Sequence, residues 1–397
     1  MKVPILDLKR QYESIRGEIE PKVLRFLESG AYIMGEGVAS AERELAAFLG
    51  VKHAVAVGNG TDALTIALSA AGVKAGDEVI TTPFTFFATA EAVASLGAKP
   101  VFADIRAETL NLDPGCIEEK ITPRTKAILP VHIFGQPAQM DEINAIAQKH
   151  GLTVIEDACQ AIGAEYKGRK VGGLGALGCF SFFPTKNLGA FGDAGMITTD
   201  DDALAVICRA LREHGGGRAG AEAKSLLEGK TERFDDMQAD PMYNPYKYFN
   251  YLVGYNSRMD AMQAVILRVK LAHLNEWNRL RAEHAQYYLE RLAGTGVILP
   301  KVGKGMRPVW HQFAVRTEYK QELGDFLREK GIASGVFYPV PLHLQKAFEG
   351  LGCHEGDLPV AEMVTRQSLC LPIFPELTQP ELDYAADSII EFYSRLS

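Results

Sequence analysis

The strongest constraint on the fold is a regular alternation of short apolar runs and helical patterns between about residues 40 and 215. Runs typical of buried strands occur at 54–57, 78–82, 100–103, 127–131, 153–155 and 179–183. Helical patterns stand between several of them, at 62–71, 88–96 and 140–149. This alternation predicts an α/β fold with a mainly parallel sheet covered by helices on both faces. Ligands bind such sheets at the carboxyl ends of the strands.

The pattern changes after residue 214. Residues 215–253 form a polar stretch that contains three consecutive glycines and an aromatic cluster of Tyr243, Tyr246, Tyr248, Phe249 and Tyr251. A connection of this length is usually functional or poorly ordered, and we interpret it as an insert that forms part of a lid or a dimer contact. Long helices over 258–292 and a smaller α/β domain follow, and the last helix of that domain is predicted to start at Thr378, with Glu381 completing a capping box. We therefore expect a large domain over residues 1–255 and a second unit over 256–397.

Composition excludes several classes of function. The 397 residues include 42 Lys and Arg against 50 Asp and Glu, a net charge of −8, whereas nucleic-acid binding usually requires a basic surface. We find no apolar run long enough to span a membrane, and we expect no signal peptide, because charge and proline occur among the first residues. The six cysteines are scattered without a Cys-x-x-Cys pair, which argues against a metal site or a disulfide framework. We expect a cytoplasmic protein with reduced thiols and no metal.

Two predicted strand ends carry a lysine and a carboxylate. Lys186 follows the predicted strand 179–183 by three residues, and Asp157 follows the predicted strand 153–155. A lysine that forms a Schiff base with pyridoxal phosphate needs a carboxylate on the ring nitrogen, because the protonated ring then accepts electrons. Each residue also has an ordinary alternative: a solvated surface charge for the lysine and a helix N-cap for the aspartate.

Two further strand ends complete the pattern. Gly58-Asn59-Gly60-Thr61 joins a predicted strand to a predicted helix, so the N–H groups of Gly60 and Thr61 would face an anion. Phe84-Thr85-Phe86-Phe87 follows another strand and offers a ring that could stack on a flat cofactor, although such aromatic residues more often belong to the core. Four strand ends thus supply an anion site, a stacking ring, a carboxylate and a lysine.

The segments that carry these residues resemble a known family. Residues 59–63, 156–160, 180–189 and 254–259 are similar to the nucleotide-sugar aminotransferases of the DegT/DnrJ/EryC1/StrS family. The resemblance implies an aspartate-aminotransferase-like fold (PLP fold type I), pyridoxal 5'-phosphate as the cofactor, and a homodimer with active sites at its interface.

The resemblance also assigns roles to matching residues. Lys186 is implied to be the catalytic lysine that binds the cofactor and moves the substrate proton, with Asp157 as the partner of the ring nitrogen. The remaining implied cofactor contacts are Gly60, Thr61 and Ser181 for the phosphate, Phe86 for the ring face, Gln160 beside the phenolic oxygen, and Asn256 for the phosphate of the neighbouring subunit's cofactor.

Three residues correspond to positions near the sugar: Arg258, Tyr338 and His343. Two of them have structural alternatives, since Arg258 could be a charge at a helix end and His343 a loop residue bonded to backbone. Phe337 stands where some members of the family have a histidine.

The segment 189–195 is similar to family members that act at C3 of the sugar, and residues 5–11 resemble those acting on UDP-linked 3-keto sugars, including uronic acids. The expected function is therefore PLP-dependent transfer of an amino group, from glutamate by resemblance, to a C3 keto group of a nucleotide-linked sugar. The alternatives are a C4-specific sugar aminotransferase and a non-catalytic PLP-binding regulatory protein. Lys186 argues against a dehydratase of the same fold, since such relatives carry histidine there.

Overall fold

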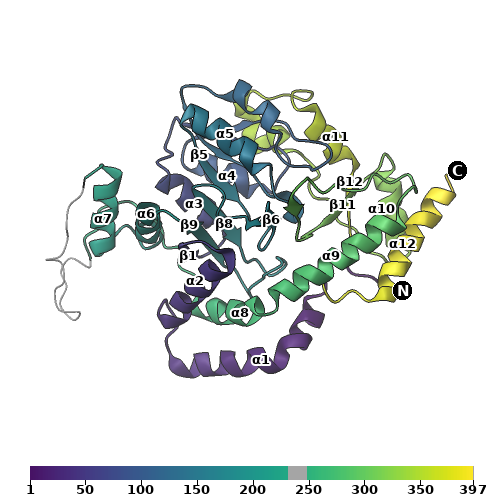
Figure 1. Cartoon of the computed structure of the whole chain (residues 1–397), viewed down its shortest axis with the longest axis horizontal. Coiled ribbons are helices and arrows are strands. Elements are labelled where there is room, and N and C mark those ends of the chain that lie inside the picture. The colour runs from purple at the N-terminus through teal and green to yellow at the C-terminus, as the bar shows by residue number, and fades with distance from the viewer. Residues whose placement is uncertain (231–247, 397) are drawn as a thin grey trace.

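A seven-stranded sheet forms the centre of the computed structural model, which describes residues 1–230 and 248–396. Across these residues the strand order is β1-β9-β8-β5-β4-β2-β3 (Figure 1). The strands are β1 (His53–Val57), β2 (Glu78–Thr81), β3 (Lys99–Phe102), β4 (Thr125–Leu129), β5 (Thr153–Asp157), β8 (Leu177–Ser181) and β9 (Gly195–Thr199). All run parallel except β9, which is antiparallel to both neighbours. The predicted mainly parallel sheet is confirmed.

Helices cover both faces of this sheet because successive strand side chains point to opposite faces. In β1, Val55 and Val57 pack with α3 (Gly60–Ala70), α4 (Ala88–Ser95) and α6 (Asp202–Arg212). Ala54 and Ala56 instead pack on the other side with α2 (Glu36–Leu49) and α8 (Ala261–Leu271). Helix α5 (Met140–His150) covers β4 and β5 on that second side. The near-continuous apolar strands therefore reflect a sheet buried on both faces.

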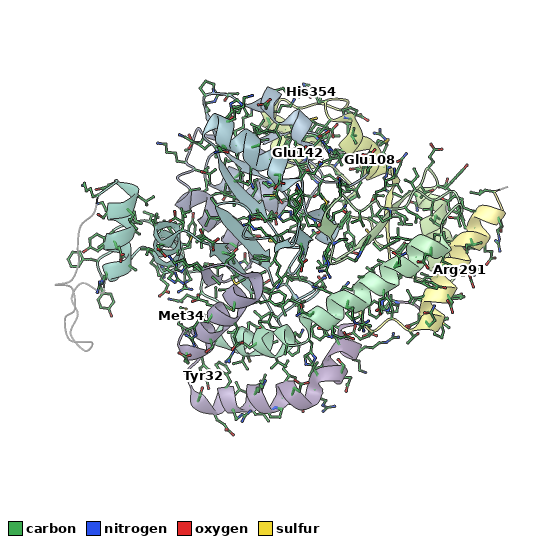
Figure 2. All side chains as sticks on the ribbon, viewed as in Figure 1. Tyr32, Met34, Glu108, Glu142, Arg291 and His354 are labelled. Atoms are coloured by element: carbon green, nitrogen blue, oxygen red, sulfur yellow. The ribbon has the colours of Figure 1, made fainter. Side chains whose placement is uncertain are left out.

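A second hydrophobic cluster lies beyond α9 (Leu274–Arg291). It contains the antiparallel pair β11 (Phe313–Arg316) and β12 (Ser368–Leu371), together with α10 (Lys320–Glu329) and α12 (Gln379–Ser394). The predicted capping box of α12 is confirmed, with Thr378 and Glu381 bonded reciprocally. Arg291, labelled at the end of α9 in Figure 2, forms an ion pair of 2.7 Å with Asp387 of α12. The domain boundary at residues 255/256 stays a prediction.

The remaining elements connect these two parts. Helix α1 (Leu8–Ser29) runs beneath α8 (Figure 1) and packs on it through Ile15 and Ile19. Short strands β6 (Glu165–Tyr166), β7 (Arg169–Lys170) and β10 (Met306–Arg307) form a small sheet, and α11 (Pro359–Gln367) precedes β12. Within the described ranges, we find no helix with the length and apolar character needed to cross a bilayer.

Part of the predicted insert is a helix, α7 (Gly217–Leu227), which packs beside α6 at the left of Figure 1. Tyr243 and Tyr246 lie outside the described residues. Tyr248 and Phe249 are exposed, and a role of this segment as a lid or dimer contact stays a prediction.

Candidate active site

The carboxyl ends of β1 and β8 lie close together at one end of the sheet. Val57 and Ser181 both pair with Gly195, the first residue of β9. A Cβ at Gly195 would lie 2.3 Å from the carbonyl oxygen of Asn59, so only glycine permits this close approach. The start of α3 is therefore held against the end of β8.

The start of α3 forms an anion cradle, made of Gly60, Thr61 and Ser181. Asn59 is the N-cap, and its side chain accepts the N–H of Asp62 at 2.8 Å. The first helical N–H groups have no partner within the helix and suit an anion. A Cβ at Gly60 would lie 2.7 Å from Cβ of Ser181 and 3.1 Å from Sγ of Cys159. The absence of a side chain at Gly60 thus brings the helix start onto the end of β8.

Asp157 is the last residue of β5 and is buried. Its Oδ2 accepts a hydrogen bond from Oγ1 of Thr89 at 2.8 Å, and its Oδ1 accepts the N–H of Cys159 at 3.2 Å. An ionised carboxylate offers about four lone-pair sites. Asp157 therefore retains the capacity to bind a protonated ring nitrogen.

Lys186 lies further beyond its strand than the sequence suggested. Strand β8 ends at Ser181, not at 183, and the chain then turns so that the N–H of Lys186 donates to the carbonyl of Phe183 at 2.8 Å. Lys186 is half-buried. Desolvation by burial lowers its pKa, while the neighbouring Cys159 and Asp157 act in the opposite direction. A lowered pKa increases the fraction of neutral amine, the form that can attack a carbonyl or accept a proton.

Three of the predicted site residues, Gln160, Tyr338 and Phe86, lie next to one another. Gln160 accepts the N–H of Phe134 through Oε1 and donates from Nε2 to the hydroxyl of Tyr338, both at 2.9 Å. The ring centroid of Phe86 lies 6.1 Å from that of Tyr338. Phe86 is 55% exposed, so it does not belong to the core, and its ring face is available for stacking.

The segment that contains Asn256 and Arg258 lies against the amino end of α3. Ser257 anchors it, since Oγ of Ser257 accepts the N–H of Gly58 at 3.0 Å and donates to Oδ2 of Asp62 at 2.6 Å. Asn256 is exposed and Arg258 is half-buried. The predicted contacts of Asn256 with a neighbouring subunit and of Arg258 with substrate stay predictions.

His343 is buried at 1% exposure. Its Nε2 lies 3.1 Å from Oε1 of Glu362, which also accepts the N–H of Gly356. This geometry favours the structural alternative for His343, although its partner is a carboxylate rather than backbone. Its contact with substrate stays a prediction.

Some residues that support the site were not singled out from the sequence. Thr89 binds the carboxylate of Asp157, and a hydroxyl in the apolar helix pattern 88–96 was the available signal. Oδ1 of Asn187, next to Lys186, lies 3.2 Å from Nδ1 of His311. Desolvation by burial, followed by the charge of Lys186, lowers the pKa of His311 well below its ordinary value. Nothing in the sequence around His311 indicated this proximity, because the two residues are far apart in the chain.

The donor set suits pyridoxal phosphate. The anion cradle can hold a phosphate, Asp157 can hold a protonated ring nitrogen, and Lys186 offers an amine whose pKa is lowered by burial. Among the described residues, we find no group of three or more His, Cys, Asp or Glu placed to hold a metal ion.

Comparison with known proteins agrees with this geometry. The model of the DegT/DnrJ/EryC1/StrS aminotransferase family matches residues 13–390. The chain belongs to this family. The match covers nearly the whole sequence, so the predicted family and the aspartate-aminotransferase-like fold are confirmed.

Three relatives illustrate the range of the family. A protein of Geobacillus stearothermophilus named a pleiotropic regulatory protein is 48% identical, with 99% of each chain covered. A dTDP-3-amino-3,4,6-trideoxy-alpha-D-glucose transaminase of Streptomyces venezuelae is 42% identical and covers 100% of this chain and 97% of its own. A UDP-N-acetyl-3-dehydro-alpha-D-glucosamine 3-aminotransferase of Acidithiobacillus ferrooxidans is also 42% identical, with coverage of 96% and 95%.

A solved structure supports the fold. DesV of S. venezuelae, crystallised with a bound intermediate, superposes with a TM-score of 0.90 at 42% identity, and both chains are covered completely. The predictions of an aminotransferase and of pyridoxal phosphate as its cofactor are confirmed by the family and by a solved relative that carries the cofactor's amino form.

Proposed function

We propose that this aminotransferase moves an amino group from glutamate to the C3 keto group of a nucleotide-linked sugar. This proposal is carried by the observation that the anion cradle, Asp157 and Lys186 all lie at the carboxyl ends of the strands. Two relatives at 42% identity, named for amination at position 3, support C3. Their nucleotides differ, and the resemblance of residues 5–11 to enzymes of UDP-linked sugars makes a UDP-linked 3-keto sugar or uronic acid the first substrate to assay.

The site residues of this chain would have separate roles in the reaction. Pyridoxal phosphate, when bound, supplies an electron sink for the negative charge that develops when a substrate carbon loses its proton. Lys186 would accept that proton on Nζ and return it to another carbon. Asp157 would keep the ring nitrogen protonated, and the anion cradle would hold the phosphate. Phe86 would cover the ring face and exclude water from it.

We also propose that the protein acts as a homodimer. Asn256 is exposed on a segment that Ser257 anchors to the amino end of α3, beside the chain's own anion cradle. An exposed amide at that place could reach the phosphate of a neighbouring subunit's cofactor. The six unpaired cysteines support a cytoplasmic location, because reduced thiols persist there.

The decisive experiment follows each half of the reaction. We expect glutamate to convert the yellow holoenzyme to the amino form of the cofactor, and a UDP-linked 3-keto sugar to restore the colour with formation of a 3-amino sugar. Borohydride reduction should fix the cofactor on Lys186. We expect Lys186→Ala to abolish turnover while circular dichroism stays unchanged, and Lys126→Ala, at an exposed position of β4, to retain activity. A Lys186→Ala enzyme with normal turnover would refute the proposal.

The name of the relative at 48% identity keeps a second candidate open, a PLP-binding regulatory protein without turnover. A holoenzyme whose spectrum does not respond to glutamate would favour that candidate. Restoration of colour only by a 4-keto sugar would favour the C4-specific alternative.

A further inference from the structure

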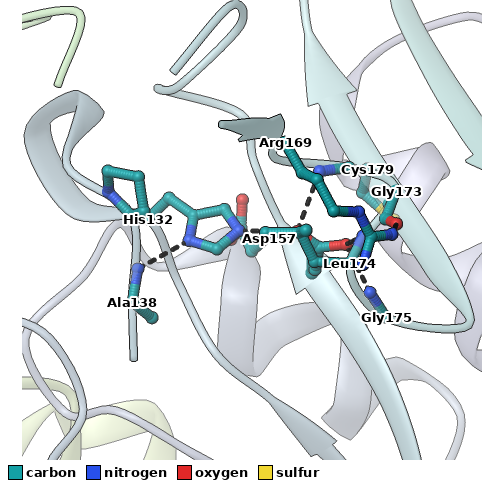
Figure 3. Close-up of polar contacts among 12 residues, drawn as sticks. His132, Ala138, Asp157, Arg169, Gly173, Leu174, Gly175 and Cys179 are labelled. Atoms are coloured by element: carbon teal, nitrogen blue, oxygen red, sulfur yellow. Dashed lines mark hydrogen bonds and ion pairs between the residues drawn. The ribbon is translucent and has the colours of Figure 1, made fainter. Parts of the chain in front are cut away.

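Asp157 is preceded in β5 by a second carboxylate, Glu156, which points to the opposite face of the sheet. Glu156 and His132 are both fully buried, and Nε2 of His132 lies 2.9 Å from Oε2 of Glu156. Figure 3 shows His132 between Ala138 and the end of β5, and it shows Leu174 and Gly175 on the side of β5 that lies away from His132. The mechanism proposed above gives neither residue a role.

Hydrogen bonds define the protonation of this pair. The N–H of Ala138 donates to Nδ1 of His132 at 2.9 Å, so the ring proton lies on Nε2 and is donated to Glu156. The carboxylate also accepts the N–H groups of Gly172, Leu174 and Gly175 at 2.7–2.8 Å. Burial favours the neutral acid, but the bond from His132 and those from backbone outweigh it and lower the pKa of Glu156. Glu156 is therefore a buried anion with four donors.

His132 begins a turn that is hydrogen-bonded to Asp157 and Gln160, the two residues expected to face the cofactor. The N–H of Asp157 donates to the carbonyl of Pro130 at 2.9 Å, and the N–H of His132 donates to the carbonyl of Asp157 at 3.0 Å. Two residues later, the N–H of Phe134 donates to Oε1 of Gln160 at 2.9 Å. This bond orients the amide of Gln160 so that its Nε2 faces Tyr338. One turn thus supports the backbone of Asp157 and the side chain of Gln160.

The turn adopts a conformation that needs external support. Phe134 has φ of 55° and ψ of 16°, in the left-handed region that is unfavourable for a residue with a side chain. Such conformations persist only where surrounding contacts determine them, and they are frequent at functional sites. The ring of Phe134 packs edge-to-face on Phe84 at 5.9 Å. His132, fixed by Glu156 and Ala138, anchors the other end of the turn.

We propose that Glu156 and His132 are positioning residues: the buried pair fixes the turn 132–135, which orients Asp157 and Gln160 toward the cofactor. The inference rests on the proposed function, in which Asp157 holds the ring nitrogen, and on the family resemblance, which implies that Gln160 lies beside the phenolic oxygen of the cofactor. Its physical basis is that Gln160 and the peptide groups of Asp157 are bonded to the segment that His132 anchors. A small displacement of a catalytic group can cost up to about a hundredfold in rate.

The test compares two buried carboxylates of the same sheet. Glu156→Gln keeps the shape, but its amide N–H₂ replaces a carboxylate oxygen that accepts two hydrogen bonds, so two of the four donors lose their partner. Glu78→Gln is the matched control, because Glu78 is also buried and is bound by Arg124. Glu78 is the first residue of β2 and so lies at the amino ends of the parallel strands, whereas the site lies at their carboxyl ends. Both variants are measured as holoenzymes by thermal unfolding, by pH titration of the cofactor's visible absorbance, and by the rate of conversion with glutamate per bound cofactor.

We expect Glu156→Gln to shift the midpoint of the absorbance titration and to slow conversion by about tenfold or more, whereas Glu78→Gln lowers only the unfolding temperature. If Glu156→Gln does not fold, His132→Asn, which leaves the three backbone donors of Glu156 in place, is measured in the same way. A variant of the pair that binds cofactor with an unchanged titration midpoint and rate would overturn the inference. The absorbance titration requires no sugar and no turnover, so failure of the proposed function would remain distinguishable.

Discussion

Replacement of Gly60 by alanine tests the anion cradle with a single methyl group. The added Cβ would lie 2.7 Å from Cβ of Ser181, 3.1 Å from Sγ of Cys159 and 3.2 Å from Oγ of Ser181. A distance below 3.0 Å to a Cβ cannot be relieved by a rotation of Ser181, because that atom is fixed by the backbone of β8. The start of α3 or the end of β8 must therefore move.

The magnitude follows from the cost of overpacking, which is about 1–3 kcal/mol for an extra methyl group in a tightly packed site. The backbone at Gly60 lies outside the left-handed region, so alanine adds no conformational strain. Any movement displaces the N–H groups that would hold the phosphate. Since about 1.4 kcal/mol corresponds to a tenfold change in affinity, we expect Gly60→Ala to weaken binding of pyridoxal phosphate by about tenfold to a hundredfold.

The assay is a fluorescence titration of the apoenzyme with pyridoxal phosphate, combined with chemical unfolding of the apoenzyme. Gly17→Ala is the control, because a Cβ at Gly17 in α1 would meet nothing within 4 Å. Alanine is favoured over glycine in a helix by about 1 kcal/mol, so this variant should gain stability and bind the cofactor normally. If Gly60→Ala behaved like Gly17→Ala in both measurements, the close packing of the cradle would not be a requirement for cofactor binding.

Two further predictions concern Thr89 and Glu381. Thr89→Val removes the hydroxyl that donates to Oδ2 of Asp157; a hydrogen bond to a charged group contributes about 1.5–3 kcal/mol, so we expect turnover per bound cofactor to fall at least about tenfold, and normal turnover in this variant would contradict the role of that bond. Glu381 is bound by Arg10, whose hydrogen bond is the main cause that lowers its pKa to about 2. The stabilisation is complete above the unfolded pKa of about 4.3 and is lost as the pH falls toward 2. Because Arg10 is partly exposed, solvent screening limits this stabilisation to about 1 kcal/mol. The difference in unfolding free energy between wild type and Glu381→Gln should therefore shrink between pH 6 and pH 3, and a constant difference would refute this origin.

Local patterns in the sequence were sufficient for much of the architecture. The strand–helix alternation predicted the mainly parallel sheet, because burial on both faces requires apolar runs that can be read within a few residues. Cap signals also act over one turn, and the capping box of α12 was predicted from Thr378 and Glu381. The prediction for the end of β8 was wrong by two residues, since Phe182 and Phe183 continue the apolar run after the strand pairing ends at Ser181.

The support of the site depends on contacts between residues distant in the chain. Gln160 meets Tyr338, Asn187 meets His311 and Glu156 meets His132 only because the strand order brings their loops together. The residue types alone gave no preference among such pairings, since a buried histidine can have many partners.

Residue identity was therefore enough to indicate which groups could hold pyridoxal phosphate: a glycine at a helix start, an aspartate at a strand end and a lysine in the loop after a strand. Their mutual distances, the burial that lowers the pKa of Lys186 and the turn that orients Gln160 came only with the folded chain. The physical reason is range: backbone conformation responds to near neighbours in sequence, whereas desolvation and hydrogen-bond partners are set by whatever segments pack together.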